Sequence, residues 1–167
     1  SYLLTSYDTE EGRVFSDHNV SGVMAGFENV PIFSSDPPQT DDAIYFGFEQ
    51  DLSNHLIGFQ FQVDQAEGAG INPNQPPYLW EVMGTGPENE WVRIDVDHDD
   101  TLGLNQSGMI RVHLPQMRKV SRNDINAYWV RLRLNLEDTN SRYDVSPYLN
   151  QLAVEGSGGT VSSTNVT

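Results

Sequence analysis

The feature that most constrains the fold of this chain is the regular alternation of side chains at 128–136 (YWVRLRLNL). Every second position carries a large apolar side chain: Tyr128, Val130, Leu132, Leu134 and Leu136. A period of two fits a β-strand with one buried face, because successive side chains of a strand point to opposite sides of a sheet. The segment is therefore predicted to be a strand whose other face carries Trp129, Arg131 and Arg133 away from the aliphatic core.

The same pattern recurs along the chain. It appears at 43–49 and 55–64, which a hairpin or short crossover joins, and again at 109–114 and 148–154. Segments 78–83 and 91–96 flank a turn-rich connector and are predicted to pair, whereas 116–126 is predicted to form a helical turn. Seven or eight short strands predict an all-β fold, an antiparallel two-sheet β-sandwich of the jelly-roll type. Its predicted core includes Phe46, Phe59, Phe61, Ile94, Val112, Val130, Leu132 and Leu134.

The sandwich is predicted to occupy residues 41–155 as one domain, a size that can support its own core. Residues 1–40 show no sustained periodicity and are expected to form an irregular amino-terminal arm with one short strand. Residues 156–167 (GSGGTVSSTNVT) have the composition of a linker, here to a missing carboxyl-terminal region. The first residue is Ser1, without Met, so we expect the chain to be a piece of a longer polypeptide.

Charge and composition limit the function. The chain has 24 acidic and 9 basic residues, a net charge of -15, and this field repels phosphate backbones and anionic lipids. Nucleic acid and membranes are therefore not expected as partners. The acidity itself fits an acidic binding surface, adaptation to salt or simple solubility. No Cys is present, and no GxSxG, Walker or GxGxxG motif occurs, so we do not expect an enzyme.

One set of polar and aromatic side chains is a candidate ligand site, because alternation places all of them away from the aliphatic core: Trp129, Arg131, Arg133, Gln60, Gln62, Arg111 and His113. An indole can stack on a sugar ring, and arginine or glutamine can form planar hydrogen bonds with hydroxyl groups. These residues predict a glycan-binding face. The alternative is that this face packs on the amino-terminal arm or on a neighbouring domain, with arginine stacked over tryptophan as a structural contact.

A weaker candidate is a calcium site at Asp97 and Asp99, within the acidic stretch DVDHDDT. Alternating aspartates resemble the start of a calcium loop, but the sixth and twelfth positions of an EF-hand, which require Gly and Glu, hold Asp100 and Gln106 here. The two readings are a calcium site on the sandwich and a solvated acidic turn. No other cofactor is expected.

Several segments resemble a known family. These are YLWEVMGTGPENEWVRIDVDHDDTLGLNQSGMIRVHLP, AYWVRLRLNL, PYLNQLAVEGSGGTVSSTNVT and, upstream, AIYFGFEQDLSNHLIGFQFQV. In order and spacing they are similar to a segment of the baseplate assembly proteins (baseplate J-type) of phage-tail-like contractile injection systems. The matched positions are Trp80, Glu81, Gly84, Trp91, Asp99, Thr101, Leu104, Ser107, Gly108, Pro115, Tyr128, Trp129 and Arg131. The turn GTGPENEW is longer than its counterpart in that family, and the first 40 residues match nothing.

The resemblance implies a non-catalytic, structural or accessory β-sandwich, resembling a carbohydrate-binding module, in a baseplate protein that assembles in the cytoplasm into a tail-like particle or virion. Its partners would be other baseplate or tail proteins, or neighbouring domains of the parent chain. The alternative is a carbohydrate-binding module, stabilised by calcium, in a secreted multidomain protein, with a glycan as its partner.

Overall fold

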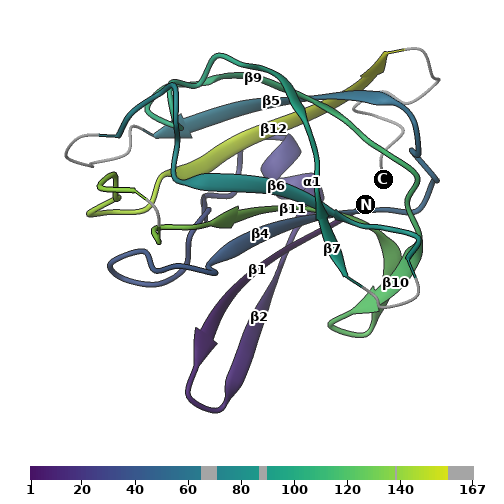
Figure 1. Cartoon of the computed structure of the whole chain (residues 1–167), viewed down its shortest axis with the longest axis horizontal. Helices are drawn as coiled ribbons and strands as arrows, with labels where there is room; N and C mark the ends of the chain where they lie inside the picture. The colour runs from purple at the N-terminus through teal and green to yellow at the C-terminus, as the bar shows by residue number, and fades with distance from the viewer. Residues whose placement is uncertain (65–70, 87–89, 138, 158–167) are drawn as a thin grey trace.

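The computed structural model (Figure 1) describes residues 1–64, 71–86, 90–137 and 139–157. They form two antiparallel β-sheets, which confirms the predicted all-β sandwich, while the jelly-roll connection stays a prediction. The seven-stranded sheet contains β1 (Tyr2–Thr9), β2 (Gly12–His18), β4 (Ala43–Phe48), β6 (Tyr78–Met83), β7 (Trp91–Arg93), β10 (Lys119–Arg122) and β11 (Ile125–Leu134). The five-stranded sheet contains β3 (Val30–Pro31), β5 (Leu56–Asp64), β8 (Val96–Asp99), β9 (Gly108–His113) and β12 (Tyr148–Ser157).

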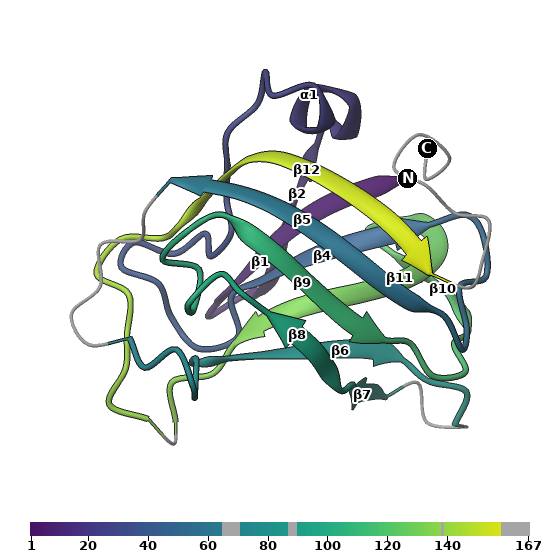
Figure 2. The ribbon, with the colours of Figure 1, turned by 90° about the horizontal axis from the view of Figure 1, so that it is seen from above.

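The spatial order is β2-β1-β4-β11-β6-β7 in the larger sheet, with β10 paired to β11, and β3-β12-β5-β9-β8 in the smaller one. Figure 2 shows the smaller sheet lying across the larger. The short helix α1 (Val20–Met24) begins at Asn19, whose side-chain oxygen accepts a hydrogen bond from the Gly22 N–H at 3.0 Å. Within the described ranges, no helix has the length and apolar character needed to cross a membrane.

The main hydrophobic core lies between the two sheets. All eight core residues predicted from alternation are buried there, none more than 5% exposed. The rings of Phe46, Phe59 and Trp80 pack at its centre, with centroids 4.9 Å apart for Phe46–Phe59 and 5.1 Å for Phe59–Trp80. The inward faces of 43–49, 55–64 and 128–136 were thus predicted correctly.

The first 40 residues are more regular than predicted. Strands β1 and β2 form a hairpin that projects from the body of the sandwich (Figure 1), and β1 also pairs with β4 inside the larger sheet. Alternation fails here because β1 is covered on both sides: Leu3 packs into the core between the sheets and Leu4 into a second cluster on the outer face. The expectation of an irregular arm with one short strand was wrong for this segment.

Residues 116–126 do not form the predicted helical turn. Instead β10 and β11 form a hairpin in which Arg122 pairs with Ile125 across a two-residue turn. Both turn residues, Asn123 and Asp124, have positive φ angles of 49° and 63°. This is the conformation of a type I′ turn, which Asn and Asp adopt more readily than other non-glycine residues.

The chain crosses between the sheets in two of these segments, between 43–49 and 55–64 and again within 91–96. β4 and β5 lie in different sheets, so their connection is the short crossover and not the hairpin. The predicted strand 91–96 is divided: β7 pairs with β6 in the larger sheet, as expected, while β8 pairs with β9 in the smaller one. Ile94, which lies between the two strands, is buried in the core.

Candidate functional site

The outer face of the seven-stranded sheet has a hollow of about 370 Å³ that opens to solvent. We call it the arginine–aromatic hollow, defined by Arg13 and Phe15 of β2, Tyr45 of β4, Trp91 of β7, Arg122 of β10 and Arg131 of β11. Strands β2 and β7 stand at opposite ends of the strand order, yet they line the same hollow. The sheet therefore curves around this face.

Strand register accounts for the central part of the hollow. Arg131 of β11 lies opposite Tyr45 of β4 on one side and opposite Glu81 of β6 on the other. Side chains that are directly opposite in neighbouring strands share a face and lie within contact distance. An aromatic ring, a guanidinium and a carboxylate are thus aligned across three adjacent strands.

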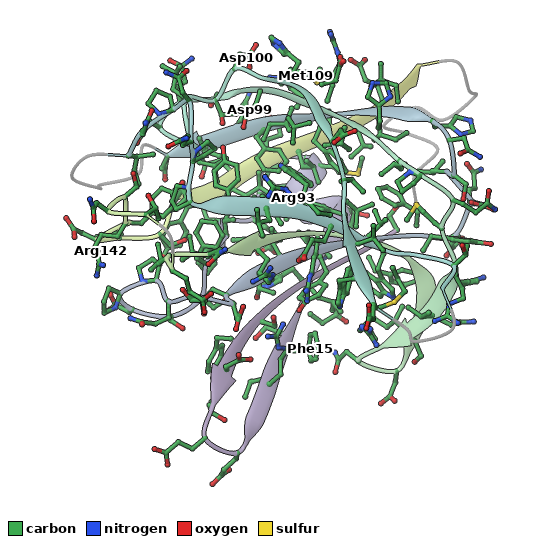
Figure 3. The ribbon with its side chains drawn as sticks, viewed as in Figure 1. Phe15, Arg93, Asp99, Asp100, Met109 and Arg142 are labelled. Atoms are coloured by element: carbon green, nitrogen blue, oxygen red, sulfur yellow. The ribbon has the colours of Figure 1, made fainter. Side chains whose placement is uncertain are left out.

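Three aromatic rings meet in the hollow. The ring centroid of Tyr45 lies 5.5 Å from that of Phe15 and 5.8 Å from that of Trp91. Tyr45 is only 1% exposed, whereas Phe15 and Trp91 are half-buried, so the two outer rings flank a buried floor. Figure 3 shows Phe15 on β2. The guanidinium carbon of Arg131 lies 4.0 Å from the centroid of Trp91, a close cation–π contact.

Most of the positive charge around the hollow is neutralised by carboxylates. Glu81 accepts hydrogen bonds from Nε of Arg131 and from Nε of Arg133, both at 2.9 Å. Arg133 also donates to Asp41 at 2.8 Å. Burial would raise the pKa of Glu81, but the hydrogen bond from Arg133 and the charges of both arginines hold it below its ordinary value.

At the other side of the hollow, Arg13 is held by Asp8 and Tyr45. Its Nε and Nη2 donate to the two carboxylate oxygens of Asp8 at 2.9 and 3.3 Å, and its Nη1 donates to the hydroxyl of Tyr45 at 2.8 Å. The Tyr45 hydroxyl also lies 2.9 Å from the hydroxyl of Ser6. Arg13 therefore has a carboxylate partner and a fixed position.

Arg122 differs from the other arginines of the hollow. Its guanidinium carbon lies 5.4 Å from the centroid of Trp91, and its Nη1 donates to the carbonyl of Ser121 at 3.2 Å. It makes no ion pair with any carboxylate of the described residues. Burial lowers the pKa of Arg122, and the positive charges of Arg131 and Arg13 lower it further, against an opposing effect of Tyr45.

The predicted glycan-stacking residue, Trp129, is not available to a ligand. It points to the outer face of its sheet, as alternation indicated, but it is 0% exposed and packs with Tyr2 and Tyr45 in the second cluster. Its indole N–H donates to the carbonyl of Val120 at 3.1 Å. This part of the face packs on the amino-terminal segment, which was the alternative reading of the sequence.

Gly47 is the residue that lets this indole lie against the sheet. A Cβ atom added at Gly47 would stand 2.6 Å from Cζ3 and 2.8 Å from Cη2 of Trp129. Glycine within a strand often marks such a close approach.

We therefore expect Gly47→Ala to destabilise the fold by about 1–3 kcal/mol, since the buried ring must shift to make room. Urea unfolding measures this loss. Gly86→Ala is the matched control, because a Cβ at Gly86 meets no atom within 4 Å. Equal stability of the two variants would contradict the packing of Trp129 on Gly47.

The remaining predicted ligand residues do not share a face with Trp129, Arg131 and Arg133. They lie on β5 and β9, in the five-stranded sheet: Gln60, Gln62, Arg111 and His113. Their strands carry them outward, as alternation indicated, but on the opposite side of the sandwich. The expectation of one combined site was wrong, because alternation gives the face of each strand and not the sheet to which the strand belongs.

The two predicted calcium ligands have separate partners. An oxygen of Asp97 lies 3.4 Å from Nε2 of His113, whereas Asp99 accepts hydrogen bonds from the Tyr78 hydroxyl at 2.8 Å and from the backbone and hydroxyl of Thr101 at 2.9 and 2.7 Å. Figure 3 shows Asp99 across the molecule from Phe15. No group of three or more His, Cys, Asp or Glu side chains suited to a metal occurs among the residues that the structure describes.

Asp99 lines a second hollow, of about 490 Å³, between β6 and β8. Tyr78, Trp80, Arg93 and Asp95 contribute to the same wall. Its charged residues include two aspartates and one arginine, so an acidic group would meet net repulsion there. This is the opposite of the electrostatic character of the arginine–aromatic hollow.

Five residues of the hollow were not among the predicted site residues: Arg13, Phe15, Tyr45, Trp91 and Arg122. A signal existed for Tyr45, because the alternation at 43–49 places it on the outer face, as it does Arg131. What joins them is the pairing of β4 with β11, which the sequence does not specify. Arg13 and Phe15 lie in the segment predicted to be irregular, and Arg122 lies in the segment predicted to form a helical turn.

Comparison with known proteins finds no protein-family model that matches this chain, and no curated protein that matches it significantly.

Proposed function

We propose that this chain is a non-catalytic accessory domain that works by binding, and that its ligand occupies the arginine–aromatic hollow. The observation that carries the proposal is the gathering of three aromatic rings and three arginines in one open hollow of an otherwise acidic chain. Its volume of about 370 Å³ lies in the range of small-molecule sites, about 300–1,000 Å³. Such a hollow suits one or two units of a saccharide better than a broad protein surface.

A role in binding, and not in catalysis, is supported by the ion pairs that hold the carboxylates beside the hollow. General acid–base chemistry needs a carboxylate that can exchange a proton with a substrate. Glu81 and Asp8 are each held in ion pairs with arginines of this face. Both are therefore poorly suited to that chemistry, whereas half-buried rings and guanidinium groups suit the apolar face and the hydroxyl groups of a sugar.

We further propose that the domain belongs to a baseplate protein of a phage-tail-like contractile system. The support is the sequence resemblance over 43–63 and from Tyr78 onward, with tail proteins or neighbouring domains of the parent chain as partners. Genes for a tail sheath, tube and spike beside its gene would support this setting and assembly in the cytoplasm. A glycosidase domain on the same chain would instead favour the secreted carbohydrate-binding module.

The binding role is tested with Trp91→Ala on an array of neutral and acidic glycans. We expect the wild-type chain to bind and the variant to bind at least about tenfold more weakly, because stacking surface and the support of Arg131 are both lost. Tyr148→Ala is the matched control, an exposed aromatic residue of the other sheet. Melting curves show whether both variants stay folded. Equal binding by Trp91→Ala and the wild type would place the site elsewhere, and no binding to any glycan would contradict a saccharide ligand.

A further inference from the structure

Resting on this proposed function, we propose that the ligand is an acidic saccharide whose carboxylate binds Arg122. The arginine–aromatic hollow would take one uronic acid unit, with its carboxylate on the guanidinium of Arg122 and its ring among Phe15 and Trp91. Arg122 is the anion-binding group in this account, and the rings provide the apolar surface.

The charges around the hollow do not balance. Three arginines line the hollow, Arg13, Arg122 and Arg131, and Arg133 shares Glu81 with Arg131, but the ion pairs of these four supply three carboxylates, from Asp8, Asp41 and Glu81. One positive charge is left over. It lies on Arg122, which makes no ion pair within the described part of the chain.

Holding the charge of Arg122 in that position is unfavourable without an anion. A half-buried guanidinium beside two other arginines is stabilised by any negative charge that enters the hollow. A carboxylate can accept two parallel hydrogen bonds from one guanidinium, which adds geometric selection to the charge attraction. The type I′ turn at Asn123 and Asp124 fixes the end of β10 and so limits where Arg122 can lie.

The charge and the polar lining of the hollow also limit the rest of the ligand. One uncompensated positive charge matches one negative charge, and the net charge of -15 repels ligands that carry many. A phosphorylated or polysulfated chain is thereby disfavoured. The exposed polar side chains of Ser121 and Asn123 also line the hollow, where they can bond to hydroxyl groups. A singly charged, hydroxylated ring satisfies both requirements.

The test is isothermal titration at pH 7 with the methyl glycosides of galacturonic acid and of glucuronic acid, each of which carries one carboxylate, and with the methyl ester of each. The esters keep the sugar ring and remove the negative charge. We expect at least one free acid to bind about tenfold or more tightly than its ester, which is the scale of one hydrogen-bonded charge pair. Arg122→Gln should remove this preference, while Arg111→Gln, the same charge change on the other sheet, should keep it.

The outcomes separate this inference from the proposed function. The inference is wrong if the ester and the acid bind equally and Arg122→Gln binds as the wild type does. In that case the hollow binds saccharides but does not distinguish charged from neutral ones. If no saccharide binds, both are wrong. A tetraglutamate peptide is included as a further probe. If only the peptide binds, and Arg122→Gln abolishes its binding, the hollow is a site for acidic peptides and the saccharide assignment is overturned.

Discussion

Trp129→Ala should reduce the free energy of unfolding by about 3–5 kcal/mol, the usual cost of deleting a fully buried aromatic side chain. The indole has no exposed surface, contacts the backbone at Gly47 and donates a hydrogen bond to Val120. Its removal leaves a cavity beneath Tyr2 and an unpaired carbonyl. Urea or guanidinium unfolding, followed by circular dichroism, gives the measurement.

Trp91→Ala serves as the comparison for this prediction, since its ring is half-buried at the sheet edge and its loss should cost clearly less stability. The two variants remove the same side chain from the same face of one sheet. A loss below about 1 kcal/mol for Trp129→Ala would show that the indole is accessible. The glycan-stacking role first predicted for Trp129 would then have to be reconsidered.

Glu81→Gln should cost a similar amount, about 3–5 kcal/mol at pH 7, because it leaves the buried guanidinium of Arg131 without its carboxylate. Glu81 is 7% exposed and Arg131 is 8% exposed, so water compensates little for the lost charge. Arg133 keeps its ion pair with Asp41. Denaturant unfolding of this variant is compared with Glu155→Gln, which removes an exposed carboxylate of the other sheet and should change stability little.

The contribution of Glu81 to the free energy of unfolding also depends on pH. The pKa of Glu81 is lowered in the folded chain. The ionised carboxylate therefore stabilises the fold fully above the ordinary glutamate pKa of about 4.3. This stabilisation is lost as the pH falls below that value and through the lower pKa of the folded state. The stability difference between wild type and Glu81→Gln should therefore shrink in acid. A difference that stays constant from pH 7 to pH 3 would show that the Glu81 carboxylate is not paired.

Alternation along the chain was sufficient to predict which side chains enter the main core. Phe59 and Leu132, for example, are buried because they lie on the apolar face of a strand with period two, and that face packs against the core. The same rule placed Trp129 and Arg131 on the outer face correctly. It failed for β1, where Leu3 and Leu4 are both buried, because the strand packs against the main core on one side and against the second cluster on the other.

The candidate site was harder to predict because it depends on which strands are neighbours. Gln60 and Arg131 both point outward, but the crossover between β4 and β5 puts them on opposite sides of the sandwich. Arg13 enters the hollow only because the sheet curves and brings β2 towards β7. Strand order and curvature arise from long-range packing, which leaves little trace in local sequence patterns.

The central claim, that the arginine–aromatic hollow binds a saccharide, is tested most directly by nuclear magnetic resonance of the three indole N–H groups during titration with the methyl glycosides of the two uronic acids. Trp91 lines the hollow, Trp80 lies in the core between the sheets and Trp129 is buried under the outer face. We predict that the Trp91 signal shifts with saturation while those of Trp80 and Trp129 move little, and that Arg122→Gln weakens the shift. A shift of Trp80 without Trp91 would place binding at the hollow between β6 and β8, and no shift of any indole at saturating ligand would contradict the claim.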